Sequence, residues 1–524
     1  MDGSGSGKSA SYSIPNAFQM LGSYVFTDPK GELYDKTAGY LKAHGYEIKV
    51  LNLVRPQFSD GYNPLMHISS ELDVDVIANT VIKGQKSESG QDPYWDDMAE
   101  MLLKALIYYL IATRPEEEQN LASCAELVRA ANANGGSNLL TELMNQLPYD
   151  HPARMNYKSI EIAPEKTYGS ILSSLQSKLG KFDSKEIAEL TSTDTINFEE
   201  IGSKKTAVYV ISSDTHTAYD FLLTIFFAQM IQQLYDFADK NGGKLPMPTY
   251  FILDEFANIG KVPDFDKKIS TSRSRKISFS VILQNLDQLE AVYEKSYETI
   301  IGNCDTHVFL GSNSQKTVEY FSKALGEKTI ERENVSINKD KHNWRQGQSV
   351  SDQVMARALM TPDELRRMDN DLCIIFEKGI KPIKANKFYY FQTPMARKLD
   401  ACAINHNEVG DIDRGVWRKY NPYNPYVPED DKKKQVDNLK VESLDDLFDE
   451  PEEPKKEEKV EAPKEIKKES TMDELKIEPV QIEKPNDAPM LPQDNADDEL
   501  DIDLQKELEA KFDELFGPLE DDNN

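Results

Sequence analysis

The chain has 524 residues, 39% of them hydrophobic, which is enough for two or three domains with buried cores. Its formal net charge of −29 is uneven, because residues 429–524 carry −20 and the first 428 residues only −9. A basic nucleic-acid channel on the body of the chain is therefore not excluded. Four widely spaced cysteines lack metal-site spacing and are typical of free thiols in a reducing compartment, which excludes a disulfide-stabilised secreted domain.

Strand-like and helical segments alternate from the N-terminus onward. We expect a helix over residues 11–21, a strand over 23–27, a helix that ends near residue 44 and a strand over 47–53. This alternation predicts an α/β fold with a mostly parallel sheet.

Residues 70–190 change to helical periodicity and predict an all-α domain inserted into the sheet domain. Helices are expected over residues 95–113, 120–132, 138–147 and 169–179. The longest apolar segment, residues 101–112, is interrupted by Lys104 and is too short to cross a bilayer. Since no secretory signal is present either, we expect this chain by itself to be soluble and cytosolic.

The strand pattern resumes after the helical stretch. Strands are expected over residues 206–212, 249–253, 277–283 and 306–311, with a late pair over 372–377 and 387–391 and a long helix over 218–240. Beyond residue 427 the composition changes to Pro, Glu, Lys and Asp with few large apolar residues. Such a segment cannot bury enough surface to offset chain entropy, which predicts a disordered acidic C-terminal tail over residues 428–524.

Two adjacent carboxylates, Asp254 and Glu255, end the apolar strand expected over residues 249–253. A strand buried on both faces belongs to a helix-covered parallel sheet, which binds ligands at the carboxyl ends of its strands. There Asp254 can hold Mg²⁺ through water, and Glu255 can orient or deprotonate the water that attacks a γ-phosphate. The alternative is a buried strand that simply ends in a polar loop.

The N-terminal run MDGSGSGKS contains the core of a phosphate-binding loop. Backbone N–H groups of its glycines would curl around phosphates, Lys8 would reach the β- and γ-phosphate oxygens, and the Ser9 hydroxyl would ligate Mg²⁺. Asp2 stands where the full pattern requires glycine. The alternative is a flexible Gly/Ser tag or linker. The glycines of the loop are Gly3, Gly5 and Gly7.

Seven motifs follow one another along the chain: DPKGEL at 28–33, YNPL at 62–65, DPYWDDMAEMLL at 92–103, FILDEFANIGKVPDF at 251–265, STSRSRKIS at 270–278, ILQNLDQL at 282–289 and IIGNCDTHVFLG at 300–311. Together they resemble the motifs of the type IV secretion coupling proteins, the TraG-type ATPases of conjugative elements. The resemblance runs from about Gly3 to about Phe391 and leaves the acidic tail outside it.

The resemblance implies a RecA-like P-loop NTPase domain, interrupted by an all-α domain and assembled as a hexameric ring around DNA. It implies that hydrolysis of ATP with Mg²⁺ moves DNA, and the relaxase attached to it, toward the transfer channel. The partners would then be DNA, the relaxase, accessory DNA-processing proteins and channel subunits, at the cytoplasmic face of the cell membrane. The expected domains are the two parts of the nucleotide-binding domain at residues 1–69 and 191–427, the all-α insertion at 70–190 and the tail at 428–524.

The resemblance also implies roles for single residues. Residues 3–9 match the nucleotide loop, Asp254 the metal position and Glu255 the catalytic base. Gln284 matches the polar residue that senses the γ-phosphate. Arg273 or Arg275 matches the position of an arginine finger, a role that a permanently charged, planar guanidinium suits, and the spacing from Asp254 slightly favours Arg273.

Contacts with DNA are predicted less directly. A channel for a nucleic-acid strand needs cations for phosphates and aromatic platforms for bases. Lys261, Lys267 and Lys268 follow the carboxylate strand and are candidates by position. The aromatic residues Trp95, Tyr108 and Tyr109 of the helical insertion have the spacing of core residues, so we expect them to pack inside.

The chain departs from the family pattern at its start. Members usually carry transmembrane helices and then a strand that leads into the phosphate loop, whereas here the sequence begins at the loop. A sheet without that strand would have unpaired backbone groups beside it. Our hypothesis is an N-terminal truncation, and an in-frame stop codon directly upstream would contradict it. The alternative is a coupling protein whose anchor lies on another chain.

Three functions fit these observations. The first is an ATP-driven coupling protein of conjugation. The second is a double-strand DNA translocase of the chromosome-partitioning type, which shares the motor. The third is a catalytically weak adaptor that binds DNA and relaxase without turning over ATP. Loss of DNA transfer on substitution of Lys8 would separate a motor from an adaptor.

Overall fold

The described part of the chain belongs to one compact unit. The structure is a computed structural model, which describes residues 7–83, 93–133, 139–213, 219–338, 347–408, 410 and 412–426. These residues all lie within the unit Met1–Leu439, which is separate from Lys440–Asn524. The acidic tail expected over residues 428–524 lies outside the described residues.

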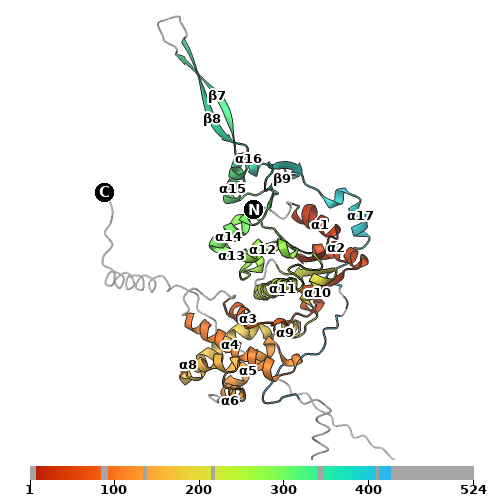
Figure 1. The fold of residues 1–524 in the computed structure, drawn as a ribbon, viewed down its shortest axis with the longest axis vertical. Coiled ribbons are helices and arrows are strands. Elements are labelled where there is room, and N and C mark those ends of the chain that lie inside the picture. Colours follow the sequence, from red (N-terminus) through yellow and green to blue (C-terminus); the bar gives the residue numbers. More distant parts are fainter. Residues whose placement is uncertain are drawn as a thin grey trace, which may run out of the picture. The chain divides into compact units, whose positions relative to one another are not determined.

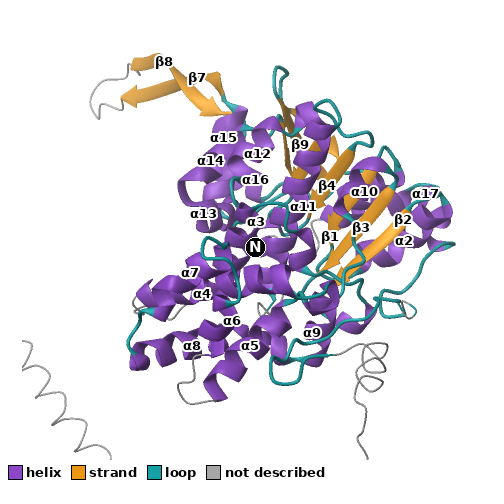
Figure 2. Cartoon of the chain, turned by 60° about the horizontal axis from the view of Figure 1, so that its bottom comes forward, coloured by secondary structure: helices purple, strands orange, loops and turns teal. Residues whose placement is uncertain are grey.

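A sheet of five parallel strands forms the centre of the described chain, in the order β2-β3-β1-β4-β5 (Figure 2). The expected α/β fold with a parallel sheet is confirmed. Pairing places Thr27 beside Leu253, and Leu253 beside Val281, so the carboxyl ends of three strands lie level. The strands are β1 (Ser23–Thr27), β2 (Glu47–Asn52), β3 (Thr206–Ile211), β4 (Thr249–Leu253) and β5 (Ile277–Val281).

Helices cover both faces of this sheet because its inner strands are apolar on both sides. In β1, Tyr24 and Phe26 belong to the core that contains residues of α1 and α2, whereas Val25 belongs to the larger core that contains α11. The expected helix over residues 11–21 begins as a single π-helical turn, Ser9–Ser13. The other helices of these layers are α1 (Ile14–Phe18), α2 (Glu32–Ala43), α10 (Phe198–Ser203), α11 (Asp220–Lys240) and α12 (Phe265–Thr271).

The described residues between 71 and 192 form helices and turns, as their periodicity predicts. Tyr109 is buried, and Trp95 and Tyr108 are partly buried against the same core, so their expected packing role is confirmed. No helix among the described residues is long and apolar enough to cross a membrane. The helices are α3 (Glu71–Lys83), α4 (Pro93–Thr113), α5 (Leu121–Ala133), α6 (Leu139–Asn145), α7 (Pro152–Glu161), α8 (Glu165–Leu179) and α9 (Lys185–Ser192).

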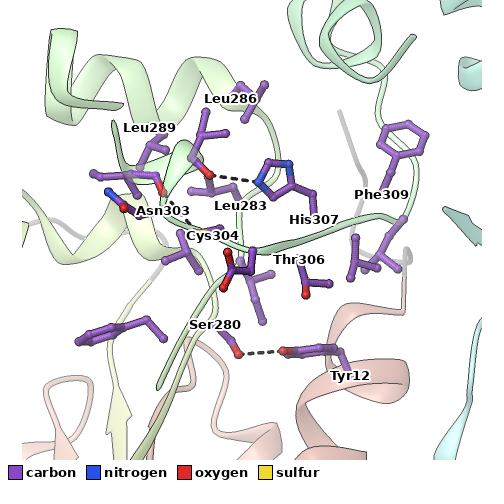
Figure 3. A pocket seen from close by; sticks show the side chains of 18 of the residues that line it. Tyr12, Ser280, Leu283, Leu286, Leu289, Asn303, Cys304, Thr306, His307 and Phe309 are labelled. Atoms are coloured by element: carbon purple, nitrogen blue, oxygen red, sulfur yellow. Dashed lines mark hydrogen bonds between the residues drawn. The ribbon is translucent and has the colours of Figure 1, made fainter. Parts of the chain in front are cut away.

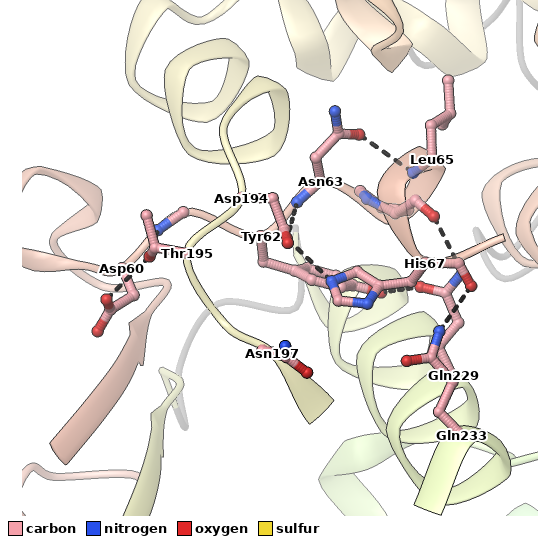
Figure 4. Close-up of polar contacts among 12 residues, drawn as sticks. Asp60, Tyr62, Asn63, Leu65, His67, Asp194, Thr195, Asn197, Gln229 and Gln233 are labelled. Carbon is pink, nitrogen blue, oxygen red and sulfur yellow. Dashed lines mark hydrogen bonds and ion pairs between the residues drawn. The ribbon is translucent and has the colours of Figure 1, made fainter. Parts of the chain in front are cut away.

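Two chain segments connect the helical part to the sheet, and polar side chains fasten them to each other (Figure 4). On the incoming segment, His67 Nε2 lies 2.9 Å from Asp194 Oδ1 of the outgoing segment. The same oxygen accepts the N–H of Asn63 at 3.1 Å. The Tyr62 hydroxyl donates to Oε1 of Gln229 on α11 at 2.6 Å. The insertion is therefore anchored at both its entry and its exit, next to α11.

A second, antiparallel sheet of order β10-β9-β6 follows the first in the chain. It consists of β6 (Thr306–Phe309), β9 (Leu372–Glu377) and β10 (Ile383–Asn386). The expected strand over residues 372–377 is confirmed, but the one over 387–391 is wrong. The chain leaves β10 because Lys387 turns inward and donates to the carbonyl of Leu310 at 2.8 Å, and Tyr390–Gln392 form a 3-10 turn.

A long hairpin was not predicted from the sequence. Its strands β7 (Glu327–Asn338) and β8 (Gly347–Ala358) pair antiparallel along their full length. Figure 1 shows it extending beyond the neighbouring α15 and α16. Its largely polar arms lack the alternation that marks a half-buried strand.

The remaining helices are α13 (Leu286–Tyr293), α14 (Tyr297–Gly302), α15 (Gln315–Leu325), α16 (Pro362–Arg366) and α17 (Met395–Asp400).

The first turn of α2 is held by a buried carboxylate at the carboxyl end of β1. Asp28 is 3% exposed, and its Oδ2 accepts the N–H of Tyr34 at 2.8 Å. Burial raises the pKa of this carboxyl from 3.8 to about 6, although backbone N–H groups oppose the shift. The motif DPKGEL therefore places an acid with a raised pKa at the edge of the sheet where ligands bind.

The replacement Asp28→Asn is expected to change how stability depends on pH. Because the folded-state pKa lies above the unfolded value, Asp28 contributes stability that is complete below about pH 4 and lost as pH rises through about 6. The contribution amounts to about 3 kcal/mol for a shift of this size. Urea unfolding between pH 4 and 7 should show the unfolding free energy of the natural chain, relative to that of the variant, falling by about 3 kcal/mol. The same pH dependence in both proteins would contradict the raised pKa of Asp28.

The replacement Tyr62→Phe is expected to lower the free energy of unfolding by about 1–3 kcal/mol, since it leaves the buried Oε1 of Gln229 without its partner. Urea unfolding monitored by circular dichroism would measure the change. As a control, Tyr297→Phe removes a hydroxyl that contacts the exposed Glu298 and should leave stability nearly unchanged. Equal effects of the two replacements would show that the Tyr62 hydrogen bond does not anchor the insertion.

Candidate nucleotide-binding site

The two predicted carboxylates lie where β4 ends. Asp254 is 9% exposed, and its carbonyl accepts the hydroxyl of Thr27 from the end of β1 at 2.7 Å. Glu255 follows in the left-handed region, with φ of +51°, a conformation that non-glycine residues seldom adopt. The turn is held on its other side by β5, because the N–H of Phe256 donates to the carbonyl of Ile282 at 3.1 Å. Adjacent strands thus fix the position of both carboxylates.

Residues from three distant parts of the sequence meet at Glu255. Lys8 Nζ lies 2.8 Å from Glu255 Oε1 and 3.8 Å from Asp254 Oδ1. The amide nitrogen of Gln284 donates to the same Glu255 oxygen at 3.0 Å. The structure therefore brings together the four side chains Lys8, Asp254, Glu255 and Gln284 that the sequence singled out.

Burial dominates the electrostatics of Asp254. It raises the pKa of this carboxyl, whereas the nearby Lys8 ammonium lowers it and the neighbouring Glu255 raises it again. The Lys30 ammonium also lowers the pKa of Asp254, by less than Lys8 does. A divalent cation would further offset the negative charge of the two carboxylates.

The described chain begins at Gly7, the last glycine of the predicted phosphate-binding loop. Gly7 has φ of +77°, and its carbonyl accepts both the N–H and the hydroxyl of Ser11 at 2.7 Å. A π-helical turn begins at Ser9, directly after Lys8, and the Lys8 ammonium is the group of this segment that contacts the carboxylates. Gly3 and Gly5 lie outside the described residues.

The donor set at this point fits a hard cation that keeps most of its water. No cluster of three or more His, Cys, Asp or Glu side chains in the described ranges could hold a metal ion by itself. Mg²⁺ usually needs only one or two carboxylates, with phosphate and water completing its shell. Asp254 is a carboxylate of this kind, with Lys8 Nζ 3.8 Å away, and the Ser9 hydroxyl stays a predicted second ligand.

The two candidate arginines lie elsewhere. Both precede Ile277, at the amino end of β5, roughly 16 Å along the strand from the carboxylates. Arg275 binds Asp239 with two nitrogens, at 3.0 and 3.2 Å, and lies over the ring of Tyr235. The Arg273 side chain is 92% exposed and approaches Asp305 at 3.5 Å. Only Arg273 is thus available to a second molecule.

A cavity of about 650 Å³ lies between β5 and β6 and reaches Lys8 and Gln284 (Figure 3). Among the described residues, β5 pairs only with β4, and β6 pairs only with β9. The hydroxyl groups of Tyr12 and Ser280 lie 2.8 Å apart across one end of the cavity, a contact that the sequence did not suggest. The cavity is therefore bordered by two edge strands, β5 and β6, each of which has one unpaired side among the described residues.

The lysines proposed for DNA contact differ in their surroundings. Lys261 and Lys267 are exposed, and Lys267 pairs with Asp264 at 2.6 Å. Burial lowers the pKa of Lys268. The structure thus presents Lys261 and Lys267 at the surface, and their part in DNA binding stays a prediction.

Comparison with known proteins agrees with the resemblance seen in the motifs. A family model described as "Type IV secretory system Conjugative DNA transfer" matches residues 1–411. Protein VirD4 of Agrobacterium fabrum is 25% identical over 421 residues, covering 76% of this chain and 59% of that protein. Conjugal transfer protein TraG of Escherichia coli is 26% identical over 427 residues, covering 74% of this chain and 66% of TraG. This chain thus spans about three fifths of the length of these relatives.

Solved structures show the same fold. The bacterial conjugative coupling protein TrwBdeltaN70 aligns with a TM-score of 0.52 at 16% identity, over 73% of this chain and 82% of that one. The plasmid coupling protein TrwB in complex with the non-hydrolysable ATP analogue ADPNP aligns with the same TM-score and identity, over 83% of its chain. The described chain therefore shares the fold of TrwB, built around the helix-covered sheet of five parallel strands. Since the family model covers 411 of the 524 residues, the chain belongs to the family of type IV secretory system conjugative DNA transfer proteins.

Proposed function

We propose that this protein is an ATP-driven coupling protein of conjugative type IV secretion, which links a relaxase–DNA complex to the transfer channel and pumps DNA. The observation that carries the proposal is the meeting of Lys8, Glu255 and Gln284 beside the buried Asp254. Membership of the family does not by itself require these side chains, which come from the ends of β4 and β5 and from the N-terminal loop, to meet at one point. ATP hydrolysis does require such a group.

Each residue then has a chemical role. Lys8 and the backbone N–H groups around Gly7 bind the phosphates, and Asp254 and Ser9 hold Mg²⁺, which neutralises phosphate charge. Glu255 orients the attacking water and accepts its proton. Gln284, which donates to Glu255, transmits the presence of the γ-phosphate to β5.

The contact between Lys8 and Glu255 links the phosphate-binding group to the proposed base. Its 2.8 Å ion pair occupies both the cation that phosphates need and the base that water needs. Phosphate oxygens that draw Lys8 away would free Glu255 at the same time. Binding and activation of the base are thus coupled through one ammonium group.

The partners and the assembly are inferred from the family. The named relatives are conjugal transfer and coupling proteins, so we propose DNA, a relaxase, accessory DNA-processing proteins and channel subunits as partners. A homo-hexameric ring at the cytoplasmic face of the membrane agrees with a fully exposed Arg273 that could serve a neighbouring subunit. The domain limits at residues 70, 191 and 428 belong to this proposal.

The replacements Lys8→Ala and Glu255→Gln test the motor. Both should abolish DNA-stimulated ATP hydrolysis, but only Lys8→Ala should weaken ATP binding, because Glu255 acts on water. We expect Glu255→Gln to slow hydrolysis at least 100-fold, in the range of general-base catalysis. A coupled phosphate-release assay measures the first effect and calorimetric titration the second.

The exposed Lys323 of α15 provides a matched control, since Lys323→Ala removes one ammonium far along the sequence from the motifs. Hydrolysis that survives Glu255→Gln would refute the assigned base. A natural chain that binds DNA without hydrolysing ATP would instead be the weak adaptor. Transport of unmodified duplex DNA as efficient as transport of relaxase-bound DNA would favour the chromosome-partitioning type of translocase.

The two arginines should respond differently to replacement. Arg273→Ala is expected to lower hydrolysis at least 100-fold, because an arginine finger typically contributes more than this. It should leave stability nearly unchanged, because the side chain is 92% exposed and its 3.5 Å pair with Asp305 is a surface contact. Arg275→Ala should cost about 1 kcal/mol of stability, because it loses the two contacts with Asp239 and the ring of Tyr235.

Mixing subunits decides whether Arg273 acts in a neighbour. A mixture of Lys8→Ala and Arg273→Ala chains contains interfaces that pair an intact loop with an intact arginine. Partial recovery of hydrolysis is expected. No recovery in an assembly that demonstrably mixes would contradict a finger acting between subunits.

A further inference from the structure

An aromatic segment, residues 388–391, lies beside the phosphate-binding loop although about 380 residues separate the two in sequence. Its residues are Phe388, Tyr389, Tyr390 and Phe391. The sequence pattern predicts a strand here, but residues 390–392 instead form a 3-10 turn. Four consecutive aromatic residues are thus available for something other than strand pairing.

The first contact joins this segment to the loop directly. A Cβ atom placed on Gly7 would lie 2.8 Å from Cε1 of Tyr389, so the ring rests on the bare Cα of the glycine. The Tyr389 hydroxyl points to the carbonyl of Asn370 at 3.4 Å. The loop glycine and this tyrosine therefore fit each other, and any larger residue at position 7 would displace the ring.

The aromatic rings of the segment also contact one another. The rings of Tyr389 and Phe391 are stacked, with centroids 5.0 Å apart and planes 23° apart. Tyr390 meets Phe391 edge-on at 5.7 Å and packs against the core that covers one face of the sheet. Phe391 is thus held from two sides and lies one ring beyond the residue that touches Gly7.

Two of these rings face solvent. Phe388 is 53% exposed and Phe391 is 55% exposed. Phe391 exposes an apolar surface while Tyr389 and Tyr390 hold its ring in place, which leaves it available to an apolar or planar partner. A flat, rigidly held ring next to a phosphate loop is suited to stack on a planar heteroaromatic ring.

We propose that the aromatic segment binds the nucleobase of the nucleoside triphosphate, with Phe391 stacked on the base and Phe388 beside it. The inference rests on the proposed function of the loop, since the phosphates must lie at Gly7 and Lys8. Recognition through ring faces accepts any base, so ATP and GTP should bind with similar affinity.

The experiment compares ATP with inorganic tripolyphosphate, which has the phosphates but no base. Calorimetric titration of the full chain with each ligand, in the presence of Mg²⁺, gives two affinities for every variant. Phe391→Ala should weaken ATP binding about tenfold, the usual effect of losing one base–aromatic stack, and leave tripolyphosphate binding unchanged. Phe391→Tyr keeps a ring and should restore ATP binding.

Each other outcome has a definite meaning. If Phe391→Ala and Phe388→Ala leave both affinities unchanged, or lower both equally, the segment does not read the base and the inference fails. Unchanged affinities with a smaller sedimentation coefficient would mean that the rings contact a neighbouring subunit, which also overturns it. If the natural chain binds neither ligand, the nucleotide site itself fails. Thermal melting of each variant separates these results from unfolding.

Discussion

The level alignment of three parallel strand ends is the constraint on which the site depends. Thr27, Leu253 and Val281 lie side by side in the sheet, so the residues that follow them leave at the same edge. Asp254 and Glu255 follow the end of β4, and Gln284 follows the end of β5. Lys8 and Gln284 both contact Glu255. A shift in the register of β4 by one residue would reverse the faces of its side chains and separate this group.

The central sheet and the residues at the carboxyl end of β4 could be predicted from the sequence. An apolar run followed by two carboxylates can also be a plain strand end, and the resemblance of the ordered motifs to the coupling-protein family decided between the two interpretations. Asp254, Glu255 and Gln284 were all found in this way, and the contact with Lys8 followed from the phosphate-loop pattern. Helical periodicity likewise predicted an insertion whose aromatic residues pack inside.

Features that depend on long-range packing could not be predicted from the sequence. The aromatic residues after Asn386 have high strand propensity, yet Lys387 turns inward and the chain breaks from the sheet. The contact of Tyr389 with Gly7 joins positions that no periodicity connects. The two arginines have similar surroundings in sequence, and only the structure shows that Asp239 holds Arg275 whereas Arg273 is 92% exposed and contacts only Asp305, at 3.5 Å, among the described residues.

The single pairing of β5 bears on the dynamics of the site. Its residues are less buried than those of β4, and a cavity borders the edge away from β4. Strand ends with few buried contacts open at the lowest free-energy cost. Gln284 extends from this strand, so the side chain that steadies Glu255 is supported by the least protected part of the sheet. Any group that occupies the cavity would stiffen β5 and thereby set how long the glutamate stays oriented.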